Sequence, residues 1–271
     1  LKARGRVKRI QALARASRKA SKLYTTGAHP QATYGKEAVG MAPGAIQELR
    51  AMASASVNSG GSMGKCATTL IHVGLGPRMD PYSRVVMDQI TMWFYLISTL
   101  GDIGRLHRMW WKAKSSILDA EGVKWGSIRG PMGATIGTLV ELGWKPESPS
   151  KWIDHRGCKW EYSGKGSLGP LYAAINEAVE YKVWDKAKEH DAGAGLEVGC
   201  DMIPSRKMEK IMLKKGENPG RLYAILSGEI WPESRKHAAG LVSSPACPHC
   251  GAEVQDLFHL FWGCDTVWRS Q

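Results

Sequence analysis

The sequence contains no pair of adjacent aspartates, and its aspartates are dispersed along the chain. Polymerases and nucleases that use two metal ions need clustered carboxylates to hold Mg²⁺. The H-E-x-x-H pattern of zinc-dependent hydrolases is missing as well. We therefore expect no two-metal catalytic centre, and we name no catalytic residue in this chain.

Long apolar runs are also missing. The longest apolar stretch, near Trp93 to Leu100, is far shorter than the roughly 20 residues that cross a bilayer as a helix. We expect neither a membrane-spanning segment nor a membrane partner. The chain is nevertheless 43% hydrophobic and 271 residues long, which is enough for a real core in one large or two modest domains.

The cysteines do not form a set that indicates disulfides. Three of the six belong to the metal-ligand pattern described below, and Cys66, Cys158 and Cys200 are widely scattered. Without a pairing pattern or a signal peptide, we expect a reducing intracellular location, nuclear or cytoplasmic. The sequence begins at Leu1 and stops at Gln271, and we expect it to be a fragment of a longer reading frame.

The clearest motif lies near the end of the chain, where the order C-x2-C-x8-H-x4-C is formed by Cys247, Cys250, His259 and Cys264. A Cys-x-x-Cys pair places two thiolates on one tight turn, and Gly251 can adopt the positive φ that such a turn needs. Three sulfurs and one imidazole are a common ligand set of closed, structural zinc sites. We expect structural zinc here; the alternative is free buried cysteines beside a core histidine.

The net charge of +12 is unevenly distributed. Residues 1–22 contain nine Lys or Arg and no acid, which leaves only +3 for the rest of the chain. This asymmetry predicts a polyanionic partner, most of all RNA or DNA; the alternative is a solvated helix that only keeps the chain soluble. The candidate phosphate-binding residues are Lys2, Arg4, Arg6, Lys8, Arg9, Arg15, Arg18, Lys19 and Lys22.

Helix dominates the expected fold. Residues 1–24 form a basic amphipathic pattern, with an apolar stripe of Val7, Ile10, Leu13, Ala14, Ala20 and Tyr24. Asp80 as N-cap and Pro81 at the first turn predict the start of a core helix. Further helices are expected from Pro43, over 103–118, from Gly130 to Gly143, over 169–190, and near 203–215 and 219–228. The alternation in 151–162 predicts a β-hairpin, so the expected fold class is mainly α with a small β-hairpin and a C-terminal zinc knuckle.

These patterns divide the chain into five expected segments. They are a basic helical segment (1–56), a flexible loop (57–79), a helical connector with its hairpin at 151–162 (80–190), a glycine-rich linker (191–200), and helices with a zinc-binding module (201–271). The flexible loop is expected because residues 57–66 are rich in glycine and serine. They do not fit a P-loop, since Ser59 and Cys66 occupy the positions of its first glycine and its metal-binding hydroxyl.

The stretch CPHCGAEVQDLFHLFWGCDTVW resembles the zinc-binding region that follows the polymerase domain in reverse transcriptases of retrotransposons without long terminal repeats. The matching residues are Cys247, Cys250, Gly251, His259, Leu260, Phe261, Cys264 and Trp268. That family often has Glu-Thr or Glu-Ser before the histidine, where this chain has Gln255 and Asp256. Upstream, AHPQATYG and APGAIQELR are similar to the region just past the palm and thumb. The stretch GPMGATIGTLVELGWKPE and the tryptophan hairpin are similar to the connecting part of such polyproteins.

The resemblance implies a non-catalytic connector between an RNA-directed DNA polymerase domain and a following nuclease or RNase H domain of one polyprotein. We expect the zinc knuckle to fix the C-terminal helices and the basic residues to help hold template or primer phosphates. No position matches the catalytic aspartates of that family. The alternative function is a zinc-stabilised protein-interaction module that does not bind nucleic acid.

Overall fold

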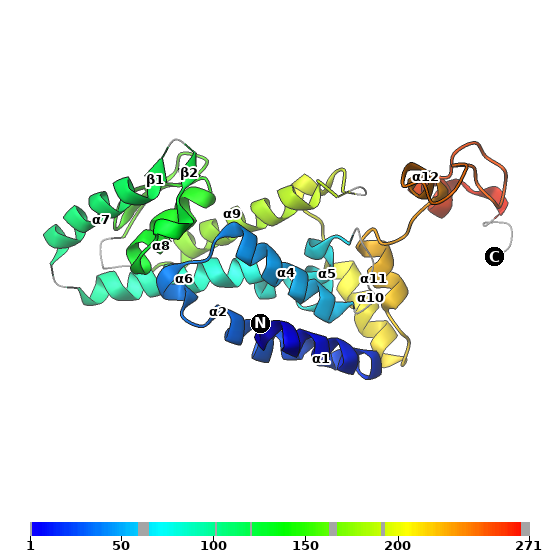
Figure 1. Cartoon of the computed structure of the whole chain (residues 1–271), viewed down its shortest axis with the longest axis horizontal. Helices are drawn as coiled ribbons and strands as arrows, with labels where there is room; N and C mark the ends of the chain where they lie inside the picture. The colour runs from blue at the N-terminus through cyan, green and yellow to red at the C-terminus, as the bar shows by residue number, and fades with distance from the viewer. Residues whose placement is uncertain are drawn as a thin grey trace.

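The computed structural model describes residues 2–58, 65–100, 102–119, 121–162, 167–190 and 193–266. Over these ranges the chain is mainly helical with two small antiparallel sheets, which confirms the expected fold class. Figure 1 shows an elongated helical body, with a compact C-terminal unit around α12 that stands apart from it at the end of an extended segment. Among the described helices, none is both long and apolar enough to cross a membrane.

The N-terminal residues form a layer whose first elements pack on α4, along the lower edge of the body in Figure 1, and whose last helix packs on α6 and α8. α1 buries Val7, Ile10 and Ala14, whereas Leu13, expected on the same stripe, is 52% exposed. The expected helix over 1–24 is interrupted at Ser17, which has an extended backbone (φ −146°, ψ 115°). The elements of this layer are α1 (Lys2–Ala16), the 3-10 helix η1 (Arg18–Ser21), the π-helix η2 (Tyr24–Ala28), α2 (His29–Thr33) and α3 (Lys36–Val39).

The middle of the chain builds the main core. Its helical elements are α4 (Pro43–Val57), α5 (Ala67–Gly74), η3 (Pro77–Met79), α6 (Pro81–Thr99), α7 (Ile103–Ile117), η4 (Trp125–Ser127), α8 (Gly130–Glu141) and α9 (Gly169–Ala187). Asp80 caps α6 as expected, because its carboxylate accepts a hydrogen bond from the N–H of Tyr82. Large side chains fill the interior between these helices, among them Trp93 and Trp110.

The hairpin expected at 151–162 is confirmed and belongs to a three-stranded sheet. β4 (Lys151–Ile153) pairs with β5 (Lys159–Glu161), and Trp152 lies opposite Trp160. On its other edge β4 pairs with β3 (Lys145–Ser148), a strand that the sequence patterns did not indicate. The carboxylate of Asp154 closes the hairpin by accepting the N–H groups of Arg156, Cys158 and the Trp160 indole. A second, two-stranded sheet consists of β1 (Leu118–Asp119) and β2 (Gly122–Val123).

The expectation of a flexible loop over 57–79 is wrong for residues 67–79, which form α5 and η3. In α5, Leu70 and Ile71 are fully buried. Gly74 lies so close to Val57 of α4 that a Cβ on it would come within 2.4 Å of Val57 Cγ1. A helix this short is marginal in water on its own, so packing on the surrounding helices stabilises it. The glycine and serine residues 59–64 lie outside the described residues.

The next elements continue the body instead of starting a separate domain. They are η5 (Leu196–Val198), α10 (Ile203–Lys214) and α11 (Gly220–Leu226). Met202 and Tyr223 belong to the same buried cluster as the middle helices, and Arg206 Nε donates to the carbonyl of His72 in α5 at 2.7 Å. The body therefore extends past the expected linker at 191–200 and ends after α11.

Candidate metal centre and basic surface

The four residues of the Cys–His motif come together in the C-terminal unit, which we call the metal module (residues 233–266). Their ligand atoms all lie within 4.8 Å of one another. Cys247 Sγ is 3.9 Å from Cys264 Sγ, and Cys250 Sγ is 3.2 Å from His259 Nε2. Cys247 and Cys264 are buried, while Cys250 lies at the surface. The sequence-predicted ligand set is thus a compact cluster that could bind one metal ion.

The first two ligands lie on a tight turn. The N–H of Gly251 donates to the carbonyl of Cys247 at 2.9 Å, and the N–H of Cys247 donates to the carbonyl of Ala252 at 2.9 Å. Gly251 has a φ of 75°, in the left-handed region that favours glycine. The local sequence therefore forms the knuckle that its Cys-x-x-Cys-Gly pattern predicts.

The other two ligands lie on a short helix and directly after it. Asp256 begins this helix, because its carboxylate accepts the N–H of His259 at 2.7 Å. The helix ends as the π-helix η6 (His259–Gly263), and Cys264 follows with an extended backbone. This turn brings the imidazole and the last thiol to the knuckle.

Gln255 connects the ligands to α12 (Glu233–Ala238), and the sequence patterns did not identify this role. Its buried side chain donates from Nε2 to Cys247 Sγ at 3.2 Å and accepts the N–H of Glu233 at 3.1 Å. Its carbonyl accepts the N–H of Ser234 at 3.1 Å. Gln255 and Asp256, the positions that depart from the resembling family, therefore both support the ligand cluster.

The surroundings of Cys247 favour its thiolate. Burial alone would raise the pKa of this thiol. The hydrogen bonds from the backbone N–H groups of Cys250 and His249 and from Gln255 have the larger combined effect and lower the pKa to about 5. The thiolate is the form of cysteine that binds metals. The module thus presents at least one ligand in the form that a metal ion requires.

The part of the metal module that follows Lys236 and holds the ligand cluster has an acidic and aromatic surface. Phe258 and Trp262, four residues apart on the short helix, are 71% and 68% exposed. No Lys or Arg occurs between Lys236 and Arg269, whereas this interval contains Glu253, Asp256 and Asp265. Such a surface does not attract phosphate groups.

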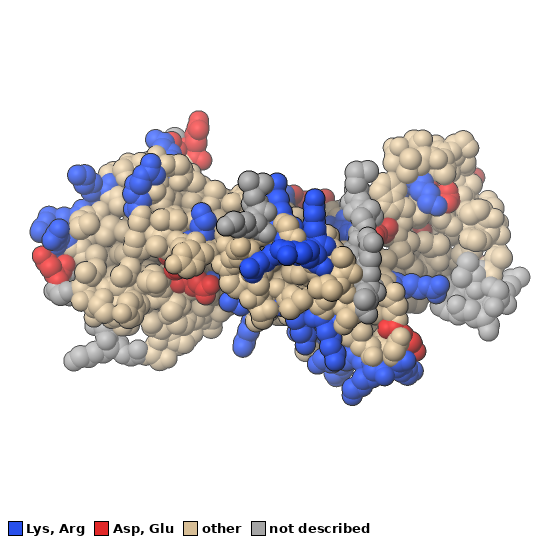
Figure 2. Space-filling view, turned by 60° about the horizontal axis from the view of Figure 1, so that its bottom comes forward, with Lys and Arg blue, Asp and Glu red and all other residues tan. Residues whose placement is uncertain are grey.

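The basic residues of the N-terminal segment lie on the body, on the outer side of α1. Lys8, Arg9, Lys19 and Lys22 are exposed. Arg4 and Arg6 are also exposed, although Arg4 Nε pairs with Glu48 at 2.6 Å and Arg6 donates to the carbonyl of Gly27. The side chains of Lys2, Arg15 and Arg18 lie outside the described part of the chain. Figure 2, which turns the lower side of the body toward the viewer, shows Lys and Arg side chains gathered there with few acids.

The basic surface continues onto α10, which the charge analysis did not single out. Burial raises the pKa of Glu209 in α10, and the positive charge of Lys22 is among the groups that oppose this rise. The end of the N-terminal helical segment therefore lies near α10. Four further lysines on or directly after this helix are exposed: Lys207, Lys210, Lys214 and Lys215. Lys207, Lys210 and Lys214 follow one another at intervals of three and four residues, a spacing that indicates one basic side of a helix.

No protein-family description, no curated protein and no solved structure matches this chain. The function of the chain is therefore proposed from its own residues and their arrangement.

Proposed function

We propose that this chain is a non-catalytic connector of a retrotransposon reverse transcriptase polyprotein, with a structural zinc module and a basic surface that binds RNA or DNA. One observation carries the proposal. Four metal ligands cluster in a unit that stands apart from the body, while the cationic side of α1 is exposed on the body itself (Figures 1 and 2). The adjacent polymerase and nuclease domains of the polyprotein are part of the same proposal, which takes them from the resemblance of the Cys–His region.

Two separations within the cluster are close to those of a tetrahedral zinc site, and the four ligand atoms lie within 4.8 Å of one another. In a tetrahedral zinc site with Zn–S near 2.3 Å and Zn–N near 2.0–2.1 Å, two sulfurs lie about 3.8 Å apart and a sulfur and a nitrogen about 3.5 Å apart. The corresponding separations here are 3.9 Å for Cys247 and Cys264 and 3.2 Å for Cys250 and His259. Four protein ligands leave no open position, so the ion would stabilise the fold without performing chemistry.

Nucleic-acid binding is assigned to the body and not to the metal module. The apolar side of α1 is occupied by its packing on α4, and the cations on its other side are exposed. Exposed Lys and Arg that neutralise phosphates release counterions and so supply most of a sequence-independent affinity. The acidic surface of the metal module offers no such contacts.

The metal assignment is tested by elemental analysis of the purified protein. We expect one zinc per chain in the unaltered protein and a large loss in Cys250→Ser. Cys200→Ser is the matched control, since Cys200 is an exposed cysteine outside the cluster, and it should retain its zinc. Equal zinc content in the unaltered protein and in Cys250→Ser would overturn the assignment.

The nucleic-acid assignment is tested by the salt dependence of binding to a single-stranded RNA and a duplex DNA. Replacing Arg6, Lys8, Arg9 and Lys22 by Gln should reduce the slope of log affinity against log salt by about 3, since each phosphate contact contributes roughly 0.7 to 0.9. A control that removes equal charge elsewhere replaces the exposed Lys124, Lys145, Lys159 and Lys188. We call this fourfold variant the α1 variant, and it includes Lys22, which follows η1. An unchanged slope in it would refute the phosphate-binding role of these four cations.

A second function is favoured by the exposed Phe258 and Trp262 on an acidic surface. In this alternative, the metal module binds a basic, apolar protein segment, and the chain does not bind nucleic acid. It predicts negligible affinity for RNA and DNA at about 0.15 M salt. The same titration therefore distinguishes the two functions.

A further inference from the structure

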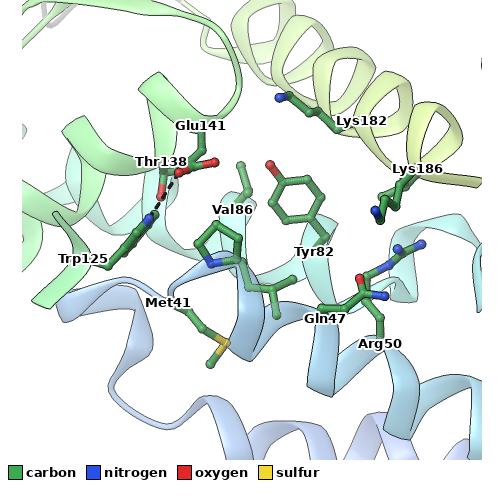
Figure 3. Close-up of a pocket in the computed structure, with 13 residues that line it drawn as sticks. Met41, Gln47, Arg50, Tyr82, Val86, Trp125, Thr138, Glu141, Lys182 and Lys186 are labelled. Atoms are coloured by element: carbon green, nitrogen blue, oxygen red, sulfur yellow. Dashed lines mark hydrogen bonds between the residues drawn. The ribbon is translucent and has the colours of Figure 1, made fainter. Parts of the chain in front are cut away.

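A pocket of about 180 Å³ lies in the body between α4, α6, α8 and α9. Its apolar lining includes Met41, Ile46 and Val86, and Trp125 and Tyr82 add aromatic surface (Figure 3). A cavity of about 150 Å³ can bind benzene. The pocket therefore has room for one substituted six-membered ring but not for a drug-sized ligand.

Uncharged and acidic polar side chains also line the pocket, namely Gln47, Tyr82, Glu141 and Thr138, whose hydroxyl donates to Gln89. Glu141 accepts a hydrogen bond from Trp125 Nε1 at 3.3 Å through Oε1. The hydroxyl of Tyr82 points toward the side of the pocket on which Glu141 and Lys182 lie (Figure 3). Burial and the charge of Glu141 raise the pKa of Tyr82, so its hydroxyl is a donor at neutral pH. The pocket thus offers one carboxylate acceptor and one hydroxyl donor to a polar ring.

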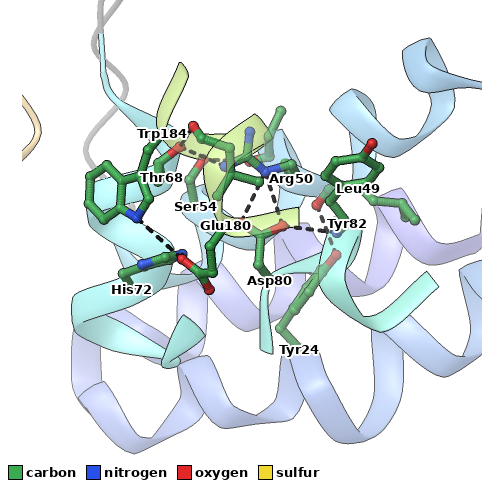
Figure 4. A network of polar contacts seen from close by, with 12 residues as sticks. Tyr24, Leu49, Arg50, Ser54, Thr68, His72, Asp80, Tyr82, Glu180 and Trp184 are labelled. Carbon is green, nitrogen blue, oxygen red and sulfur yellow. Dashed lines mark hydrogen bonds and ion pairs between the residues drawn. The ribbon is translucent and has the colours of Figure 1, made fainter. Parts of the chain in front are cut away.

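The cations of the pocket come from α4 and α9. Arg50 is held by Asp80 and Thr68, and its charge is balanced by Asp80 (Figure 4). Lys182 and Lys186, one helical turn apart on α9, are exposed and line the same side. Lys186 also pairs with Glu189, but an exposed pair of this kind is weak. Both lysines can therefore reach an anion at the edge of the pocket.

We propose that this pocket binds one cytosine nucleotide, with the base between α4, α6 and α8 and its phosphate at Lys182 and Lys186. Among the bases, cytosine combines a single ring with an exocyclic amino group, which a Glu or Asp side chain accepts. Uracil would place a carbonyl oxygen against Glu141 instead. Tyr82 and Trp125 provide aromatic faces of the kind on which unpaired bases stack.

The inference extends the proposed nucleic-acid function, since the pocket would read an unpaired base of a strand bound to the body. Its test is independent of that function because it uses mononucleotides. We expect cytidine 5′-monophosphate to bind the full chain about tenfold or more tightly than uridine 5′-monophosphate, measured by calorimetry or ligand-observed NMR. Absence of binding, or equal binding of the two, would overturn the inference. The salt slope of the α1 variant could be unchanged while the cytidine nucleotide still binds more tightly than the uridine nucleotide. That result would refute the phosphate-binding role of α1 but not the pocket inference.

Glu141→Gln gives a sharper test, because it keeps the shape of the side chain. Its carbonyl can still accept from Trp125, and its amide then presents a donor to the base. The ratio of the affinity for the cytidine nucleotide to that for the uridine nucleotide should fall to about one or below one. A loss of affinity for both nucleotides without a change in their ratio would mean that Glu141 does not face the base, and would refute the assignment.

The phosphate position is tested with Lys182→Gln/Lys186→Gln. In the unaltered protein the nucleotide should bind more tightly than cytidine itself, and this difference should disappear in the double variant while cytidine binding remains. Lys188→Gln is the matched control, since Lys188 is exposed near the end of α9, pairs with Asp185 and does not line the pocket. An equal effect of the control and the double variant would contradict the phosphate position.

Discussion

Arg50 and Asp80 form an ion pair inside the body. Arg50 Nε lies 3.0 Å from Asp80 Oδ2, and the two side chains are only 5% and 2% exposed. Arg50 also donates to Thr68 Oγ1, and Thr68 in turn donates to the carbonyl of Val183 (Figure 4). The pair thus connects α4, α5 and the start of α6 to α9. Its members satisfy one another, and together they join these helices of the body.

Asp80→Asn should lower the free energy of unfolding by about 3–5 kcal/mol, because it leaves the Arg50 guanidinium buried without its counter-charge. Asparagine can still cap α6, so the loss reports the charge and not the cap. The measurement is the urea unfolding midpoint. Arg50→Met/Asp80→Asn should recover much of the stability, since it removes both charges. A double variant less stable than Asp80→Asn would contradict this account.

Gln255→Ala should weaken the zinc binding proposed above by about 10- to 100-fold without removing a ligand. The substitution deletes the donor to Cys247 Sγ and the acceptor for the N–H of Glu233, and loss of a hydrogen bond around a metal ligand has an effect of this size. Competition with a chromophoric chelator measures the affinity. Gln47→Ala, an exposed glutamine of the body, should bind zinc like the unaltered protein. Equal affinities in all three proteins would rule out the role of Gln255.

Gly74→Ala should destabilise the body by about 1–3 kcal/mol, because the new methyl group would collide with Val57. Gly44 is also helical but has no atom within 4 Å of an added Cβ. Gly44→Ala should therefore stabilise the chain by about 0.5–1 kcal/mol. Thermal and urea unfolding of the two variants check the opposite signs. Val57→Ala in the Gly74→Ala background should restore part of the loss.

His29 should make the body less stable in mild acid. Burial and then the positive charge of Arg84 lower the pKa of His29 to about 4, below the ordinary histidine value near 6.5. The fold favours neutral His29, so its contribution is complete above pH 6.5 and is lost by about 1.4 kcal/mol per pH unit as the pH falls from 6.5 toward 4. His29→Gln should remove this part of the slope of unfolding free energy against pH. Comparing the two proteins cancels any release of metal, and identical slopes would contradict the prediction.

The sequence predicted those features that local rules determine. Features of this kind are the Asp80–Pro81 start of α6, the hairpin around Asp154 and the spacing of the four metal ligands. In each case the residue types that form the feature are neighbours in the chain or follow a fixed spacing. Local geometry alone therefore restricts where their side chains can lie.

Features that depend on distant residues were not predicted. The role of Arg50 requires Asp80, 30 residues away, and the burial of α5 requires helices on several sides. Gln255 acts on Cys247 only because the short helix folds back over the knuckle. Leu13 shares the apolar spacing of Ile10, but it is 52% exposed. Apolar periodicity predicts which side of a helix is buried, but it does not predict how much of that side the neighbouring helices cover.

The two flanks of residues 59–64 are held by residues that are translated much later. Asn58 donates to Glu229 at 2.8 Å, and the N–H of Cys66 donates to the carbonyl of Ser227 at 2.8 Å. A nascent chain that ends before these positions cannot complete the packing around α5. These two contacts join the end of α4 and the start of α5 to the chain around Ser227 and Glu229, so they can form only after α11 has been synthesised. Truncation before Ser227 should therefore remove both contacts, while the packing of α5 on α4 and α9 remains.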